Sequence, residues 1–357
     1  MKILLVHNYY RDRGGEDVYF DSLVKLLKKN GCQVITFTKK SSDIISIDKK
    51  VEAIKSLFNL NNKINRELSG LISKERPDVA HFHNLYPSIG PAAYYVCKKY
   101  NIPIVQTIHN YRLSWPEGIF FSPSRSWIYS LIFSLSILFN LKKKVYDLVD
   151  YFIFPSRFTY NYYLKHARFK IKKYSIIFHF ADIKLSVKPI KKSNYFLFAG
   201  RFSQEKGIIP LLQVFSKLPK INLLVIGDGP EKYLVDRYKK CGNIKILGWL
   251  KKEQLNFYIK RALGVVIPSL SYEVLPLSAI ESLSLGTLII VPKTAVFEEI
   301  IKDKKGVIFF RYNDFNDLQN KIIKTFKNPP TLKNISYNEF SPDKHYLSLK
   351  RIYKRLI

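Results

Sequence analysis

Two acidic residues, eight positions apart, mark the segment of this sequence best suited to bind a polar ligand. Glu273 lies in an expected loop, and Glu281 lies inside the helix expected to follow. One carboxylate could reach sugar hydroxyls while the other reaches a ribose, and the start of the helix between them would offer N–H groups to an anion. That start is formed by Val274, Leu275, Pro276 and Leu277. Glu281 could also be an ordinary surface acid, but its place beside an apolar stripe favours a buried hydrogen bond to a ligand.

Two cations stand at the end of another expected strand, 195–200. Arg201 follows that strand directly and Lys206 precedes the next helix, with Gly200 and Gly207 beside them. At the carboxyl end of a strand, such a pair can hold a pyrophosphate and neutralise the charge that develops as it leaves. The alternative is a pair of surface cations in a lysine-rich chain. The strand end and the flanking glycines favour the site.

Two glycine-rich turns follow expected strands. Gly14 and Gly15 come after the first strand, where glycine lets backbone N–H groups approach an anion at a helix N-terminus. A tight turn alone would explain this pair equally well. The turn 226–230 has a similar pattern, and we expect its role to be mainly structural.

Histidines stand at two further strand ends. His109 directly follows the expected strand 104–108 and lies at the edge where ligands bind, although a single histidine there is more often structural. His81 and His83 alternate about Phe82, so we expect them on opposite faces of a strand. That placement would disfavour a shared metal ion, and no metal site is expected.

The hydrophobic pattern predicts the scaffold for these residues. Short apolar runs alternate with longer amphipathic ones, which is typical of parallel sheets covered by helices on both faces. The expected strands are 2–7, 33–38, 79–82, 104–108, 151–154, 195–200, 222–227, 244–247, 264–268, 288–291 and 306–309. The expected helices are 16–30, 61–75, 88–100, 207–218, 230–240, 251–261, 275–285 and 313–327. Ligands of such sheets bind outside the carboxyl ends of the strands.

The length of 357 residues favours two α/β domains. The expected parts are an N-terminal domain over 1–180, a linker over 181–194, a C-terminal domain over 195–338 and a last helix within 339–357. Three distant cysteines form neither a disulfide framework nor a metal site by spacing, which fits a reducing, cytoplasmic compartment. The first apolar run is too short for a signal peptide.

A formal net charge of +31 raises nucleic acid and anionic membrane as partners. The excess is spread over both halves as scattered lysine pairs, which favours solvated faces, and no specific nucleic-acid partner is expected. The apolar stretch 127–141 is bordered by Arg125 and by Lys142 to Lys144. It is too short to span a bilayer comfortably. The segment 125–144 could lie on an anionic membrane surface or pack as a buried helix against the first sheet.

Together and in this order, these motifs resemble the retaining family 4 glycosyltransferases of the GT-B fold. The match covers most of the chain, from the glycine pair through the arginine–lysine stretch and the glycine-rich turn to the paired glutamates. Further motifs resemble the branch that assembles bacterial surface polysaccharides and lipopolysaccharides. They lie at 81–84, 106–112, 154–158 and 340–353.

The resemblance implies two Rossmann-like, doubly wound domains that face a central cleft, with the last helix crossing back to the first domain. The first domain would bind the acceptor and the second the donor. The implied reaction is a retaining transfer of a hexose from a nucleotide diphosphate sugar to a glycan or lipid-linked glycan. The enzyme would be cytoplasmic, at most peripheral on the membrane, and would require no metal or other cofactor.

The family also implies a role for each site residue. Arg201 and Lys206 would bind the donor diphosphate. Glu273 would contact the transferred sugar and Glu281 the ribose, while His109 would lie beside the anomeric carbon. The nucleotide base would be held by the backbone at Gly248, Trp249 and Leu250.

The chain departs from the family at two positions. His179 stands where the family often has asparagine, and Val274-Leu275 replace the usual Phe-Gly after the first glutamate. These departures leave the role of His179 and the identity of the sugar open. Two alternatives are a basic polyanion-binding protein, which would need clustered cations with stacking aromatics, and a catalytically silent GT-B protein that binds a nucleotide sugar.

Overall fold

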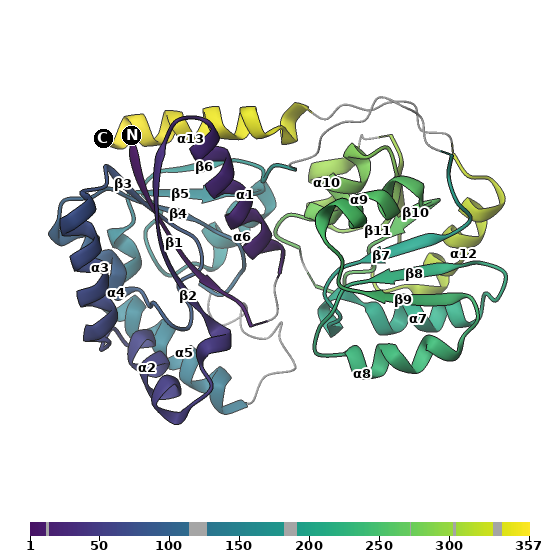
Figure 1. Cartoon of the computed structure of the whole chain (residues 1–357), viewed down its shortest axis with the longest axis horizontal. Helices are drawn as coiled ribbons and strands as arrows, with labels where there is room; N and C mark the ends of the chain where they lie inside the picture. Colours follow the sequence, from purple (N-terminus) through teal and green to yellow (C-terminus); the bar gives the residue numbers. More distant parts are fainter. Residues whose placement is uncertain (12–13, 114–126, 182–190, 272, 303–304, 331–337) are drawn as a thin grey trace. The chain divides into compact units, whose positions relative to one another are not determined.

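The computed structural model describes residues 1–11, 14–113, 127–181, 191–271, 273–302, 305–330 and 338–357. For residues 127–130 and 338 it describes the backbone alone. The chain forms two compact units (Figure 1). Unit 1 comprises Met1–Phe180 and Pro342–Ile357, and unit 2 comprises Ala181–Ser341. The division expected from the sequence has the same first boundary, whereas its last segment begins at 339 instead of 342.

Unit 1 is built on a six-stranded sheet in the order β2-β1-β3-β4-β5-β6, with all neighbours parallel. Its strands are β1 Lys2–Tyr9, β2 Gln33–Lys40, β3 Val79–Phe82, β4 Ile104–Thr107, β5 Tyr151–Phe154 and β6 Tyr174–Ile176. Its helices are α1 Gly15–Lys29, α2 Ile47–Leu57, α3 Asn62–Glu75, α4 Ala92–Lys99, α5 Trp127–Lys142, α6 Arg157–His166 and α13 Pro342–Leu356. The central strands are buried along their length because helices cover both faces of the sheet.

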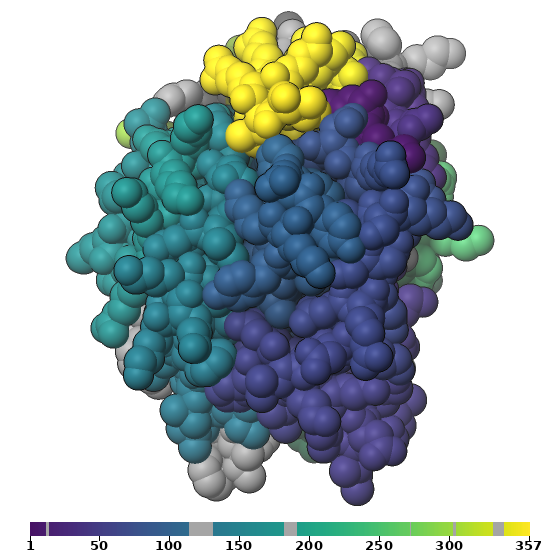
Figure 2. Space-filling model, turned by 90° about the vertical axis from the view of Figure 1, so that its left-hand side faces the viewer, coloured from purple at the N-terminus to yellow at the C-terminus, as the bar shows by residue number. Residues whose placement is uncertain are grey.

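Helix α13 completes unit 1 although it is the last element of the chain. It buries Leu349, Ile352 and Tyr353. Figure 2 shows it, in yellow, lying across one end of the unit against segments from the beginning and the middle of the chain. The expected return of the last helix to the first domain is therefore confirmed.

Unit 2 repeats the architecture with the strand order β12-β11-β10-β7-β8-β9, again all parallel. Its strands are β7 Phe196–Ala199, β8 Leu223–Ile226, β9 Ile244–Gly248, β10 Gly264–Val266, β11 Leu288–Pro292 and β12 Val307–Phe310. Its helices are α7 Ile208–Ser216, α8 Lys232–Val235, α9 Lys252–Arg261, α10 Leu277–Ser284, α11 Ala295–Ile301 and α12 Phe315–Lys327. Phe196, Leu211 and Phe215 belong to a core in which nothing of their side chains is exposed.

All eleven expected strands are present in the structure, each within two residues of its predicted bounds. The sequence analysis missed β6, α2, α6 and α11. The helix expected at 230–240 is shorter, because α8 ends at Val235 and a 3₁₀ helix, Asp236–Lys240, continues it.

Candidate active site

The glycine-rich turn 226–230 supports the loop that carries Arg201. Gly227 has φ of +145°, and a Cβ there would lie 1.9 Å from the carbonyl oxygen of Gly200. Phe202 N–H donates to the carbonyl of Asp228 across 2.8 Å. Only glycine fits this close approach of two backbones. The turn is therefore structural, as expected, and it fixes the loop at the carboxyl end of β7.

A second close approach brings Lys206 beside Glu273. Gly207 has φ of +67°, and a Cβ there would lie 2.1 Å from the carbonyl oxygen of Pro268. The loops after β7 and β10 are thereby held together. Lys206 Nζ lies 2.7 Å from Glu273 Oε1, which also accepts a 2.6 Å hydrogen bond from Ser269 Oγ.

Arg201 and Lys206 both lie at this edge of unit 2, and each has a carboxylate partner there. Arg201 Nη2 is 2.5 Å from Glu205 Oε1. Burial raises the pKa of Glu205, but the charges of Arg201 and Lys206 and hydrogen bonds to the carboxylate together outweigh it, so the net pKa is lowered and the carboxylate stays ionised. About a third of each cation's side chain is exposed, so an anionic ligand can reach both. A diphosphate bound here would share the two cations with these carboxylates or displace the carboxylates from them.

The second glutamate lies in α10, as predicted. Glu281 forms an ion pair with Lys252 of α9. The helix itself begins at Leu277, so Val274, Leu275 and Pro276 lie in the loop before it rather than in its first turn. This start is two residues later than predicted, since the backbone at Pro276, with φ of −80° and ψ of 82°, is not helical.

The predicted base-binding segment follows β9. Gly248 has φ of +71°, and its carbonyl oxygen accepts a 2.9 Å hydrogen bond from Gly227 N–H. This bond places the segment beside the turn that supports Arg201. Trp249 is 62% exposed, so its indole ring offers a free surface for stacking.

The first glycine pair begins α1 in unit 1. Gly14 is the residue before the helix, and its N–H donates to Asp17 Oδ2 across 2.9 Å. Asp17 also pairs with His7, Nε2 to Oδ1 at 2.8 Å, and is buried. The half-buried Glu16 lies in the same first turn, and desolvation of its carboxyl group raises its pKa. The start of α1 is thus capped by its own acids, which makes it less suited to an anionic ligand than the sequence suggested.

His109 lies in unit 1 between two other histidines. His83 Nδ1 is 2.9 Å from His109 Nε2, and His179 Nε2 is 3.1 Å from His109 Nδ1. Two further buried histidines lie nearby, His7 on β1 and His345 on α13.

The prediction that His81 and His83 lie on opposite faces is wrong. Their ring centroids are 4.4 Å apart, because residues two positions apart in a strand point to the same face. Within the described ranges, no group of three or more histidines, cysteines or acids has a geometry that could hold a metal ion.

The histidine cluster is the part of the site that sequence reasoning missed. The residues were weighed one at a time, and no common site was predicted for them. The available signal was their position: His83, His109 and His179 each stand just after a strand of the same parallel sheet. Carboxyl ends of parallel strands meet at one edge, so residues at these positions come together.

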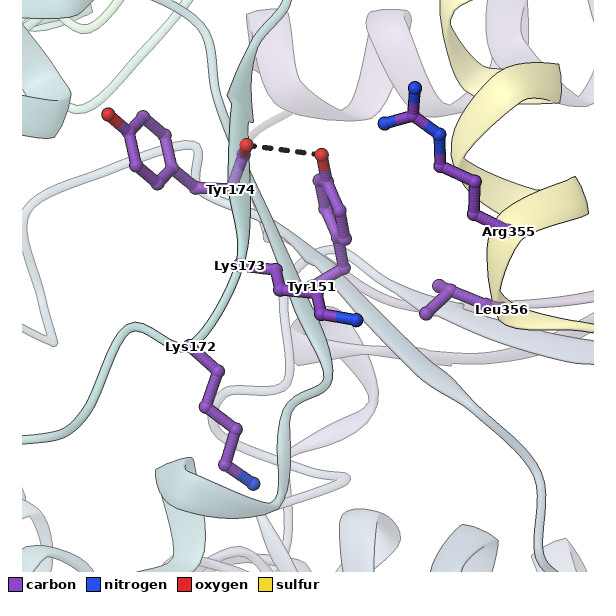
Figure 3. A pocket seen from close by; sticks show the side chains of 6 residues that line it. All are labelled: Tyr151, Lys172, Lys173, Tyr174, Arg355 and Leu356. Carbon is purple, nitrogen blue, oxygen red and sulfur yellow. Dashed lines mark hydrogen bonds between the residues drawn. The ribbon is translucent and has the colours of Figure 1, made fainter.

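Two adjoining cavities of about 410 and 430 Å³ lie at the opposite edge of unit 1, where β5 and β6 begin. Figure 3 shows the first cavity, where Tyr151 Oη donates a 3.1 Å hydrogen bond to the carbonyl of Tyr174. Lys172, Lys173 and Arg355 line it as well. Because the cavities lie at the amino ends of the strands, we do not assign them to the candidate active site.

The predicted membrane segment is helical over Trp127–Lys142, and Arg125 lies outside the described residues. Phe133 and Ile137 are buried against unit 1, whereas Leu131 and Leu135 are about half exposed, at 50% and 49%. The buried side therefore fits the expectation of a helix packed in unit 1, and the exposed side fits the expectation of a segment on a membrane surface. A search of the described residues found no helix with the length and hydropathy of a membrane span.

The two parallel six-stranded sheets define a two-domain protein of the GT-B fold, and sequence comparison identifies its family. Residues 13–185 match the family described as Glycosyltransferase Family 4, and residues 181–341 match Glycosyl transferases group 1. The chain therefore belongs to the glycosyltransferases, and the resemblance drawn from its motifs is confirmed.

Three known proteins illustrate the likeness. The alpha-monoglucosyldiacylglycerol synthase of Acholeplasma laidlawii is 24% identical over 310 residues, which cover 79% of this chain and 74% of the relative. Sucrose-phosphate synthase from Thermosynechococcus elongatus has a TM-score of 0.73 at 19% identity, covering 100% of this chain and 99% of that one. HepE from Anabaena, solved with UDP and glucose, has a TM-score of 0.67 at 14% identity, covering 99% of each chain. The two structures support the fold alone.

Proposed function

We propose that this protein is a retaining glycosyltransferase that moves a hexose from a nucleotide diphosphate sugar to a hydroxyl group of a growing, lipid-linked surface glycan. The observation that carries the proposal is the arrangement at the carboxyl edge of unit 2. Two partly exposed cations, Arg201 and Lys206, lie there with Glu273, in loops that glycine contacts hold in place.

Each of these groups has a chemical task in the proposed transfer. Arg201 and Lys206 stabilise the diphosphate as it leaves, since its charge grows while the bond to the sugar breaks. Glu273 accepts hydrogen bonds from the sugar hydroxyls and Glu281 from the ribose. Because the cations supply the positive charge, we expect transfer without added divalent metal and unchanged by EDTA.

We assign the acceptor to unit 1 and the donor to unit 2, with His109 of unit 1 beside the anomeric carbon. The Acholeplasma relative supports a lipid-linked acceptor, since its name describes a lipid that carries an α-linked glucose. The complex of HepE with UDP and glucose supports a nucleotide-sugar donor.

The proposal includes an anionic membrane surface as a partner, reached through 125–144 and through α2. Helix α2 turns apolar residues outward: Ile47, Val51 and Ile54 are 77%, 42% and 40% exposed. Their spacing of four and three residues forms one stripe, and Lys50 and Lys55 are exposed as well. An exposed apolar stripe with lysines beside it fits the headgroup region of an anionic bilayer.

Helix α5 continues this surface. The rings of Phe58, just after α2, and Phe139 of α5 lie 5.7 Å apart, centroid to centroid. Lys143 Nζ lies 6.0 Å from the centre of the Phe139 ring. The exposed leucines of α5 are on the same helix, one and two turns before Phe139.

Vesicle flotation tests the membrane part. The protein should float with vesicles of anionic lipid at low salt, and Lys50→Glu with Lys55→Glu should abolish flotation. The matched control is Lys324→Glu with Lys327→Glu on α12 of unit 2, which changes the net charge equally and should leave flotation intact. Wild-type protein that stays at the bottom, or a control as defective as the α2 variant, would refute this surface.

A thermal-shift screen tests the donor site. UDP, GDP, ADP and CMP with their sugars are compared on the wild type, Arg201→Ala and Glu281→Ala, with the exposed Arg237→Ala as a control for lost charge. A ligand at a hundred times its Kd should stabilise the fold by about 2.7 kcal/mol. Stabilisation of the wild type and the control alone supports the site. If no nucleotide sugar binds while DNA binds in a salt-dependent way, the polyanion-binding alternative replaces the enzyme; binding without transfer favours the silent GT-B protein.

A further inference from the structure

Three imidazoles in unit 1 form one continuous chain of hydrogen bonds, which we call the imidazole chain: His83, His109 and His179. Both ring nitrogens of His109 are used, Nε2 with His83 Nδ1 at 2.9 Å and Nδ1 with His179 Nε2 at 3.1 Å. His83 and His179 are 4% and 5% exposed. The outer nitrogens of the chain, His83 Nε2 and His179 Nδ1, are buried and have no hydrogen-bond partner among the described groups.

The geometry restricts the tautomers of these rings. A neutral imidazole has one N–H donor and one acceptor nitrogen, so each link of the chain needs one of each. If His83 donates from Nδ1, His109 must donate from Nδ1 to His179, which then carries its own proton on Nδ1. If the chain runs the other way, all three protons sit on Nε2. The three rings therefore adopt the same tautomer, and a mixture would bring two N–H groups or two lone pairs face to face.

The neighbouring histidines lie outside this chain because other groups fix them. His345 Nδ1 donates to the carbonyl of Phe178 across 2.8 Å, and its Nε2 accepts from Tyr19 Oη across 2.9 Å. His7 pairs with Asp17. Tyr19 also stacks on His179 with ring centroids 4.0 Å apart. The stack holds the plane of the His179 ring.

We propose that His179 is a positioning residue that, through the imidazole chain, fixes the orientation and tautomer of His109 and keeps it neutral during sugar transfer. The inference rests on the proposed function, which places His109 beside the anomeric carbon. Positive charge develops at the sugar ring as the glycosidic bond breaks. A neutral ring there does not oppose that charge, whereas an imidazolium would.

The surroundings of His109 support the neutral form. Burial lowers the pKa of His109 well below its usual range. The neighbouring imidazoles act in the same direction, first His179 and then His7 and His81. Tyr19, from α1, is a further titratable neighbour; its ring centroid is 5.2 Å away, and burial raises its pKa, so it is also neutral.

Nitrogen NMR of the histidine rings tests the chain without reference to activity. In the wild type, all three rings should show one tautomer, either Nδ1–H or Nε2–H throughout. In His179→Phe, the His109 ring should lose that single form and its pKa should rise, because the partner and its repulsion are both gone. Mixed tautomers in the wild type, or His109 signals unchanged by His179→Phe, would overturn the proposal.

Kinetics test the positioning role. His179→Phe should lower kcat about tenfold or more with little change in the donor KM, since misplacing a catalytic group affects the reacting geometry most. The acid limb of its rate profile should move to higher pH, and His179→Asn, which keeps a hydrogen-bonding side chain, should restore part of the rate. Tyr19→Phe is the matched control, because it keeps the stacked ring and removes only the hydroxyl bond to His345.

The two readouts separate this inference from the proposed function. If the wild type transfers no sugar but shows one tautomer that His179→Phe disrupts, the proposed function fails and the imidazole chain stands as geometry only. If transfer proceeds and His179→Phe has the wild-type rate and pH profile, the proposed function stands and the positioning role is refuted.

Discussion

Lowering the pH from 7 to 5 should weaken unit 1 and spare unit 2. All seven histidines of the sequence lie in unit 1. Burial lowers the pKa of His81 to about 3 and of His345 to about 4, from an ordinary value of 6.5. Unfolded chains take up protons at these rings once the pH falls below 6.5, whereas the folded unit does so only near pH 4 or 3. Stability is therefore complete above 6.5 and is lost as the pH falls through that interval.

The size of the effect follows from these pKa values. The contribution of each ring to the free energy of unfolding falls by roughly 1.9 kcal/mol between pH 7 and 5. The two rings together therefore lower the free energy of unfolding of unit 1 by roughly 4 kcal/mol. The three rings of the imidazole chain, whose pKa values burial also lowers, act in the same direction. Glu16 opposes them, since its raised pKa favours proton uptake by the folded state, but it is one group against five. A loss of this size is a large part of the 5–15 kcal/mol typical of a folded domain.

Hydrogen exchange with mass spectrometry measures both units in the same sample. After correction for intrinsic exchange, core peptides of unit 1 should exchange about 500-fold faster at pH 5 than at pH 7. Peptides of unit 2 serve as the internal reference and should keep their protection. Equal protection of unit 1 at the two pH values would refute the assignment of these five histidines as neutral in the folded unit.

Three substitutions test the donor site and the two cores. Arg201→Ala should weaken binding of the nucleotide diphosphate by about 2 kcal/mol, or roughly thirtyfold, because a charge-assisted hydrogen bond is lost; calorimetry measures it, and unchanged affinity would remove Arg201 from the site. Gly227→Ala should destabilise unit 2 by about 2 kcal/mol or more, because its Cβ would meet the Gly200 carbonyl at 1.9 Å; equal urea midpoints would contradict this. Tyr353→Phe should lower the free energy of unfolding of unit 1 by about 1–2 kcal/mol, because buried His81 Nδ1 loses its 2.6 Å partner; an unaltered unfolding curve would count against that bond.

The sequence predicted the strands well because they are buried on both faces. Val79–Phe82 and Tyr151–Phe154 are short runs without exposed positions, and their bounds were predicted to the residue. Strand β6 was missed because it has three residues, of which Tyr174 is exposed. Helix α2 was missed because three of its apolar residues, Ile47, Val51 and Ile54, face outward, so its pattern does not mark a single core-facing stripe.

The site was predicted in part. The position of its unit 2 residues at the carboxyl edge was accessible to sequence reasoning, because strand ends and helix starts mark that edge of a sheet. The pairing of Lys206 with Glu273 was not, because 67 residues separate them and the contact depends on how Gly207 meets Pro268. The imidazole chain was missed for the same reason, since its rings come from three separate strand ends.

Helix α13 has a consequence for how the protein is synthesised. In unit 1, Tyr353 forms a hydrogen bond with His81, and His345 forms one with Tyr19. The apolar face of the last helix also completes the core of this unit. These residues leave the ribosome only after all of unit 2 has been made. Although N-terminal domains generally fold first during synthesis, here the first unit to be translated is the last to be completed. Until α13 has been made, residues 1–180 present an open apolar surface that a chaperone could bind, and a fragment ending at Phe180 would keep that surface permanently.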